Sequence, residues 1–101
     1  MIDVIAFIKV KAGKRPQFLT IFKSNIPDVK AESGCIAYTA TVDLDADLPP
    51  QELDENIVTI IEKWESLEAL EAHLITSHML EYRKSVEGLV AGVKLQILQE
   101  A

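Results

Sequence analysis

The sequence predicts an α+β domain in which four strands form one antiparallel sheet and the helices cover one of its faces. Three observations carry this prediction. Short segments rich in β-branched residues occur four times, segments with helical spacing of apolar residues lie between them, and Gly or Pro stands at several junctions. The chain has 101 residues, which is the size of one domain, and we expect a single domain over residues 1–101.

The first strand is predicted over residues 2–11, a short segment rich in β-branched side chains. Gly13 ends this strand, and Pro16 stands where the first turn of a helix tolerates proline. Apolar residues then follow helical spacing over residues 16–32, which predicts a helix. Pro27 removes one backbone hydrogen bond inside this helix, so we expect a kink there.

Two further strands and a long loop occupy the middle of the chain. Gly34 is a natural end for the helix, and residues 35–43 form the second predicted strand. Residues 43–55 are acidic, contain a Pro-Pro pair and lack periodicity, which predicts a loop that is long for so small a domain. Residues 56–64 form the third strand.

The last part of the chain is predicted to form helices and a fourth strand. Ser66 is the expected cap of the first of these helices. Three leucines of this helix are expected to face the core: Leu67, Leu70 and Leu74. A further helix follows a break at residues 76–77 and ends at Gly88, and residues 90–98 form the last strand.

The resulting order, β-α-β-β-α-β, is that of the ferredoxin-like fold. A sheet with one face in water normally alternates apolar and polar side chains. The first strand instead has Ala6 and Ile8 on one face and Ile5 and Phe7 on the other. Since the helices of one chain cover only one face, we expect a second copy to cover the other in a homodimer that pairs through sheet faces. The alternative is a monomer with an exposed apolar patch.

Charge and cysteine content exclude several classes of protein. The chain has 10 Lys+Arg against 16 Asp+Glu, a net charge of −6, which argues against nucleic-acid binding. Its single cysteine, Cys35, fits a reducing compartment. The N-terminus lacks the pattern of a signal peptide, and no apolar run approaches the roughly 20 residues of a membrane span. We therefore expect a cytoplasmic protein without membrane contact.

Candidate site residues are concentrated in the second half of the chain. They are Trp64, His73, His78 and Tyr82, with Tyr38 and Glu62 in the predicted sheet. The two histidines suit acid–base work or substrate binding, because imidazole titrates near neutrality. The structural alternatives are a backbone-bonded edge residue for His73 and a helix cap for His78. Glu62 is either a general base, if partly buried, or an ion-pair partner, which we favour.

Neither a metal site nor a cofactor is expected. His73 and His78 are five residues apart and straddle the break between two helices, and the chain has no H-E-x-x-H motif and no Cys/His cluster. G-x-G-x-x-G, G-x-S-x-G and Walker sequences are also missing, so nothing indicates a nucleotide, a flavin or an acyl-enzyme.

Residues 31–43 and 62–86 together resemble the antibiotic biosynthesis monooxygenase (ABM) domain family, and the resemblance covers nearly the whole chain. The pattern that carries it is Glu32, Gly34, Cys35, Tyr38, Glu62, Trp64, Ser66, Glu68, Ala69, Leu70, His73 and His78. This pattern is fairly specific for the family and much less specific for one reaction within it.

The resemblance implies a ferredoxin-like subunit that pairs sheet to sheet into a dimeric α+β barrel. It also implies a cofactor-independent oxygenase that converts quinols or polyphenolic anthrones to quinones with molecular oxygen, the substrate itself donating the electron. The pocket would lie between sheet and helices, lined or flanked by Trp64, Tyr38, His73 and His78. A histidine would take the phenolic proton, and desolvation would keep the anion reactive.

Two departures from the family narrow the reaction. Haem-degrading relatives carry an Asn on the first strand, where this chain has Ile5, Ala6, Phe7 and Ile8. Anthrone oxidases carry polar residues near the places of Ile60 and Leu70. The leading hypothesis is therefore a monooxygenase of quinol-like or other electron-rich aromatic substrates. The alternatives are a non-catalytic dimeric domain that binds a small ligand or regulates, and a haem-binding protein.

Overall fold

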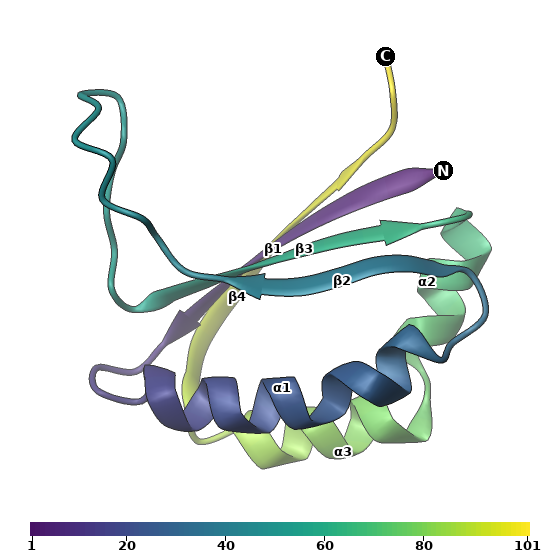
Figure 1. Cartoon of the computed structure of the whole chain (residues 1–101). Helices are drawn as coiled ribbons and strands as arrows, with labels where there is room; N and C mark the ends of the chain where they lie inside the picture. The colour runs from purple at the N-terminus through teal and green to yellow at the C-terminus, as the bar shows by residue number, and fades with distance from the viewer.

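The computed structural model describes all residues, 1–101 (Figure 1). Its elements in chain order are β1 (Ile2–Val10), α1 (Arg15–Lys30), β2 (Cys35–Thr41), β3 (Ile57–Trp64), α2 (Leu67–Leu74), α3 (Ser77–Val86) and β4 (Val90–Leu98). The order is β-α-β-β-α-α-β, in which two short helices, α2 and α3, stand between the last two strands. The predicted α+β class and the ferredoxin-like arrangement are confirmed.

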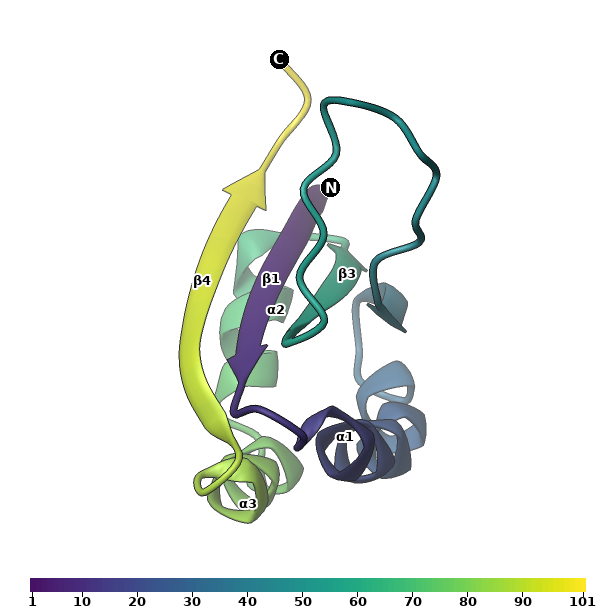
Figure 2. The ribbon, with the colours of Figure 1, turned by 90° about the vertical axis from the view of Figure 1, so that its left-hand side faces the viewer.

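The four strands form one antiparallel sheet in the order β2-β3-β1-β4. β1 lies at its centre, where Ala6 pairs with Ile60 of β3 on one side and with Leu95 of β4 on the other. All three helices lie on the same side of the sheet, and the other side is bare (Figures 1 and 2). The helix side is therefore the only place within the chain for a core.

The core follows the alternation of the strands. The fully or nearly buried strand residues all face the helices: Val4, Ala6, Ile8, Val10, Tyr38, Val58, Ile60, Glu62 and Trp64. Their neighbours on the bare face, such as Ile5, Phe7 and Ile57, are only half-buried, and Ile61 is 49% exposed. The predicted division of β1 into two apolar faces is confirmed, and β3 is divided in the same way.

The helices largely follow the predicted pattern, with one correction. Pro27 lies inside α1 without ending it, and the hydroxyl of Ser66 accepts the backbone N–H of Ala69 as the expected cap of α2. The prediction that Leu67 faces the core is wrong, because Leu67 is 48% exposed, whereas Leu70 is buried. Leu67 is the first residue of α2 and directly follows the Ser66 cap at the end of the helix. None of the three helices could cross a membrane.

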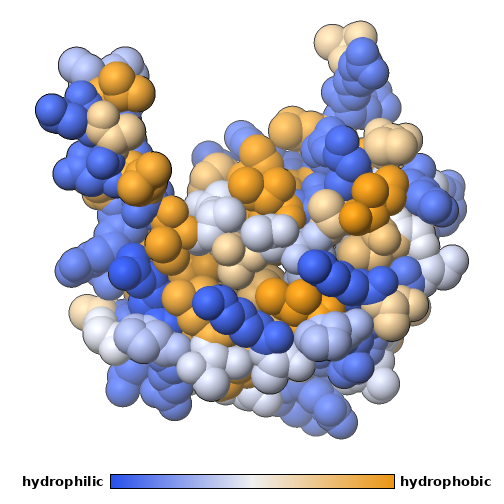
Figure 3. All heavy atoms as spheres, in the orientation of Figure 1, coloured by the Kyte–Doolittle hydropathy of each residue, from blue (hydrophilic) through white to orange (hydrophobic).

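The acidic loop between β2 and β3 projects from the body of the molecule. Figures 1 and 3 show it as an arm on the side of the sheet away from α1 and α3, and the C-terminal segment projects on the same side. Three leucines on the arm are exposed: Leu44, Leu48 and Leu53. Lys9 pairs with Asp54 at 2.6 Å and ties the end of the arm to β1. The prediction of a loop is confirmed.

Candidate functional site

A pocket of about 410 Å³ lies between the sheet and helices α2 and α3. Its wall is mainly apolar and includes Ala6 and Ile8 from β1, together with Met79 and Val86 from α3. Val93 and Leu95 of β4 close one side but are more than half exposed, because the helices do not reach the edge strand. The pocket is therefore preformed, apolar in its depth and open along β4, as is usual for small-molecule sites.

Six polar side chains interrupt this apolar wall. They are Tyr38, Glu62, His73, Tyr82, Arg83 and Glu87. Arg83 of α3 and Glu87, which follows that helix, are exposed and form the rim. The other four are buried or half-buried, so their hydrogen bonds to a ligand would form in surroundings of lower dielectric constant than water.

His73, in the last turn of α2, is the most buried of these polar groups, with 2% of its surface exposed. Its ring packs against the Trp64 indole at 4.6 Å between centroids and meets the Tyr38 ring edge-on at 5.6 Å. The Phe22 ring stacks on the Tyr38 ring, with 5.3 Å between their centroids. These contacts leave the His73 ring a single orientation against the pocket wall.

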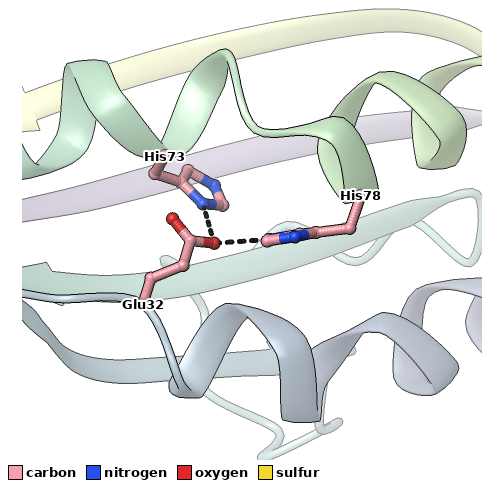
Figure 4. A group of neighbouring side chains, drawn as sticks. All are labelled: Glu32, His73 and His78. Carbon is pink, nitrogen blue, oxygen red and sulfur yellow. Dashed lines mark hydrogen bonds and ion pairs between the residues drawn. The ribbon is translucent and has the colours of Figure 1, made fainter.

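A carboxylate from outside the pocket holds one nitrogen of this ring. His73 Nδ1 lies 2.8 Å from Glu32 Oε2, and Nε2 of His78 lies 2.7 Å from the same oxygen (Figure 4). Glu32 belongs to the turn after α1, and His78 to the first turn of α3. One carboxylate oxygen thus joins three segments that are far apart in sequence.

The turn that carries Glu32 is fixed by a close approach of backbone to helix. Gly34 has φ +86°, and a Cβ there would stand 2.6 Å from the Cβ of Ala69 in α2. The carbonyl of Gly34 accepts the backbone N–H of Glu65 at 2.9 Å. Only glycine combines this left-handed backbone with such a short distance to α2. The close contact brings Glu32 within reach of both histidines.

The hydrogen bonds determine the tautomer of His73. An ionised carboxylate only accepts hydrogen bonds, so Nδ1 of His73 carries a proton and donates it to Glu32 Oε2. The neutral ring then has its lone pair on Nε2, which points away from Glu32 (Figure 4) and has no partner within the protein. Because His73 is part of the pocket wall, this nitrogen is the proton acceptor that the site offers to a ligand.

Burial sets the protonation states of three polar groups on the pocket wall, His73, Tyr38 and Tyr82. Desolvation lowers the pKa of His73, against the opposing effect of the Glu32 hydrogen bond, and so favours neutral imidazole. Desolvation also raises the pKa of Tyr38 and of Tyr82, so both remain phenols. The pocket therefore combines one neutral base with two hydroxyl groups.

Glu62 is a buried carboxyl that does not pair with a cation. Its Oε1 accepts the indole N–H of Trp64 at 2.9 Å, and its side chain forms part of the pocket wall. Burial raises the pKa of Glu62, with the Trp64 hydrogen bond opposing and the Glu32 charge adding to the shift. The ion pair that the sequence analysis favoured for Glu62 is wrong, since its partner is a neutral indole.

The structure brings most of the predicted site residues together. Tyr38, Glu62, His73 and Tyr82 line the pocket. Trp64 is fully buried behind His73 and does not reach the wall, and His78 instead lines a separate groove between α1 and α3. The catalytic roles assigned to these residues stay predictions.

Glu32 is the residue that sequence reasoning missed. It appeared in the family pattern without a role, because it lies 41 residues before His73 and no local spacing links the two. The nearest local signal is Gly34, which marks a tight turn in the chain.

Comparisons with known proteins agree with this architecture. "Probable quinol monooxygenase YgiN" of Escherichia coli (strain K12) is 39% identical over 101 residues, covering 98% of this chain and 97% of that protein. The crystal structure of PA3566 from Pseudomonas aeruginosa superposes with a TM-score of 0.83 at 26% identity, covering 99% of this chain and 93% of that one. The structure of Rv0793 from Mycobacterium tuberculosis superposes with a TM-score of 0.81 at 25% identity, covering 99% of this chain and 94% of that one. The family model for antibiotic biosynthesis monooxygenase matches residues 1–85, and the chain belongs to that family.

Proposed function

We propose that this chain is a cofactor-independent monooxygenase that oxidises quinol-like or polyphenolic aromatic substrates with molecular oxygen. The observation that carries the proposal is the His73–Glu32 pair, which presents an unpaired imidazole nitrogen on the wall of an apolar pocket. Membership of the family and the name of the Escherichia coli relative support the same reaction class. An apolar pocket with few polar groups suits a planar aromatic ring.

In the proposed reaction, His73 takes a phenolic proton from the bound quinol. The Glu32 carboxylate stabilises the imidazolium that forms, and the apolar wall leaves the phenolate poorly solvated and electron-rich. The phenolate transfers an electron to oxygen, and the phenoxyl radical and superoxide combine at a ring carbon to a peroxide anion, which takes the proton back from His73. The resulting hydroperoxide loses water, made of its terminal OH and the proton on the same ring carbon, and leaves a carbonyl there. One quinol and one O₂ thus give one hydroxyquinone and one water, and the quinol supplies all the electrons.

The other pocket residues position substrate and base. The hydroxyls of Tyr38 and Tyr82 and the carboxyl of Glu62 are proposed to hydrogen-bond the oxygen atoms of the substrate. Trp64 packs against the His73 ring and His78 holds Glu32 in place, so both are proposed to support the base. Trp64 and His78, predicted from the sequence to be catalytic, are thus proposed to position His73 without touching the substrate.

The test is oxygen uptake with a panel of benzo- and naphthohydroquinones under ¹⁸O₂, after subtraction of the rate without protein. The expected product carries one ¹⁸O atom, with the other in water. His73→Gln should lose 10²- to 10⁴-fold in kcat, the usual contribution of a general base. Glu71→Gln, an exposed carboxylate on the same helix, is the matched control and should keep the wild-type rate.

Three outcomes would contradict the proposal. Release of hydrogen peroxide with no ¹⁸O in the product indicates an oxidase. Tight binding of the hydroquinones without oxygen uptake indicates the non-catalytic ligand-binding domain. A Soret shift on haem titration, together with no turnover of quinols, indicates a haem-binding protein.

We also propose that the chain forms a homodimer through the bare face of its sheet. Ile5, Phe7 and Ile57 on that face are only half-buried, and Ile61 is almost half exposed. The arm, with its exposed leucines, projects on this same side and would reach a facing copy (Figure 3). In a two-fold symmetric pair, each copy would cover the bare sheet face of the other. The single cysteine and acidic charge fit the proposed cytoplasmic location.

A further inference from the structure

The cluster formed by Glu32, His73 and His78 contains three potential metal ligands. The ligand atoms are one carboxylate oxygen and two imidazole nitrogens, and all lie within 4.8 Å of one another (Figure 4). Each comes from a different segment: the turn after α1, the last turn of α2 and the first turn of α3. Two histidines and one carboxylate are the protein ligands of many catalytic zinc sites and of non-haem iron sites.

The three ligands are held in place by contacts outside the cluster. The Gly34 contact with Ala69 fixes the turn that carries Glu32, and Trp64 fixes the ring of His73. The Thr76 side chain caps α3 by accepting the N–H of Met79 and donates to the carbonyl of His73, which fixes the hinge between the two histidines. A metal site requires such preorganised ligands.

Side-chain shifts would bring the three ligands to the distances that an ion requires. The two N···O distances are 2.8 and 2.7 Å, and ligands of a tetrahedral zinc ion with bonds near 2.1 Å stand about 3.4 Å apart. The two N···O pairs would therefore open by roughly 0.6 to 0.7 Å. The two imidazole nitrogens, which lie within 4.8 Å of each other, would have to stand at the same distance of about 3.4 Å. The fourth position of the ion would be left to water, as in open zinc sites.

An ion can reach the cluster without passing through the main pocket. His78 has 23% of its side chain exposed and lines a groove between α1 and α3. Asp28 and Glu81 line the same groove and make its mouth acidic. His73, at the inner end of the cluster, joins this groove to the wall of the main pocket.

We propose that Glu32, His73 and His78 form a three-ligand site for a divalent transition-metal ion of the zinc class. The ion would bind Nδ1 of His73 and Nε2 of His78 in place of the protons that these atoms now donate to Glu32. A neutral imidazole that is metal-bound at Nδ1 carries its proton on Nε2. His73 would then present an N–H donor to the pocket in place of the lone pair.

The binding site itself does not depend on the reaction, whereas this last consequence rests on the proposed function. If His73 is the base, a metal ion bound at the cluster blocks it, and the chain is active only when metal-free. Metal binding and oxygen uptake can be measured separately, so failure of one proposal is distinguishable from failure of the other.

The experiment titrates the EDTA-treated, dialysed full chain with Co²⁺ and then Zn²⁺. Visible absorption of tetrahedral Co²⁺ and calorimetry with Zn²⁺ are the readouts. One ion per chain is expected, with visible bands that Zn²⁺ removes. Glu32→Gln and His78→Gln should each weaken binding at least tenfold, while the exposed control Glu71→Gln should bind as wild type does. Circular dichroism confirms that each variant is folded.

Two results would overturn the site. The first is no binding of Co²⁺ or Zn²⁺ by wild type at micromolar concentration. The second is stoichiometric binding that survives in both variants, which would place the ion elsewhere. If the ion binds as expected but oxygen uptake continues at saturating Zn²⁺, the block of His73 is wrong and the site stands. If no oxygen uptake is found with or without metal, only the proposed function fails.

Discussion

At the scale of single residues, the chemistry of this protein depends on one shared carboxylate oxygen. Glu32 Oε2 receives N–H groups from His73 and His78, and this fixes the free lone pair of His73 on the pocket side. His73 alone, with 2% of its surface exposed, would only be a buried imidazole. The Glu32 carboxylate holds the proton of the ring at Nδ1 and so leaves Nε2 as the basic nitrogen.

The loss of kcat/KM at acidic pH should report the protonation of His73. Burial lowers the pKa of His73 from its ordinary value of 6.5, so the neutral base persists below pH 6.5. We expect kcat/KM to fall only at more acidic pH. The Glu32 charge raises the pKa of His73, so Glu32→Gln should move this loss further toward acid and lower kcat. The measurement is kcat/KM against pH for both proteins. A loss that does not move in the variant would contradict the assignment.

The buried Glu62 should have its own signature in stability. Burial raises the pKa of Glu62 above its ordinary value of 4.5, so the folded state keeps the proton to higher pH than the unfolded state does. As pH rises from 4.5 through the folded pKa, Glu62 ionises first in the unfolded chain, which lowers the free energy of the unfolded state, so stability falls. Glu62→Gln removes this loss and should raise the free energy of unfolding more at pH 7 than at pH 4. Urea unfolding at both pH values checks it, with Glu71→Gln as the control. An equal effect at both values would rule the explanation out.

At the scale of elements, the α1–β2 turn determines whether the cluster assembles. The chain must approach α2 so closely at Gly34 that no side chain fits. The backbone bond from Glu65 to Gly34 then locks the turn next to the start of α2. The position of Glu32 is thus a property of the contact between turn and helix.

Two glycines with similar backbone allow a matched test of this contact. Gly13 and Gly34 have φ of +77° and +86°, but a Cβ at Gly13 meets nothing within 4 Å. Gly13→Ala should lower the free energy of unfolding by about 1–2 kcal/mol, the usual strain of a left-handed residue. Gly34→Ala carries the same strain plus the clash with Ala69, so we expect a larger loss and a reduced kcat. Thermal or urea unfolding of both variants decides it, and equal losses would contradict the role of the contact.

At the scale of the whole molecule, the sheet has one face covered by helices and one face bare. The helices, the pocket and the Glu32 cluster occupy the covered side, while the arm and the C-terminal segment project on the bare side (Figures 1 and 2). Chemistry and the proposed pairing surface are thereby separated. A dimer would support the pocket from behind.

Two exposed apolar residues provide a matched pair for testing the dimer. Ile61, on the bare face, is 49% exposed, and Leu80, on α3, is 51% exposed. We expect wild type to sediment as a dimer at micromolar concentration and Ile61→Lys to sediment as a monomer, because a lysine there would be buried in the interface. Leu80→Lys should remain a dimer. A monomeric wild type, or two dimeric variants, would contradict the proposed face.

The sequence by itself determined the elements of the fold and the two faces of the sheet. Strand alternation, helical spacing and turn residues are local, so β4, the Ser66 cap and the split of β1 into two faces were predictable from neighbours along the chain. Four of the six predicted site residues also line the pocket, and three of these four belong to the family pattern.

Only the tertiary structure decided how these residues act together. The Glu32–His73 bond spans 41 positions, and the docking of the Gly34 turn on α2 that creates it has no local signature. The same docking turned two histidines without a metal motif into part of a three-ligand cluster. The packing of α2 against the sheet also placed Trp64 behind His73, with 4.6 Å between the ring centroids. These outcomes depend on which distant segments pack together, and packing is settled by the whole fold.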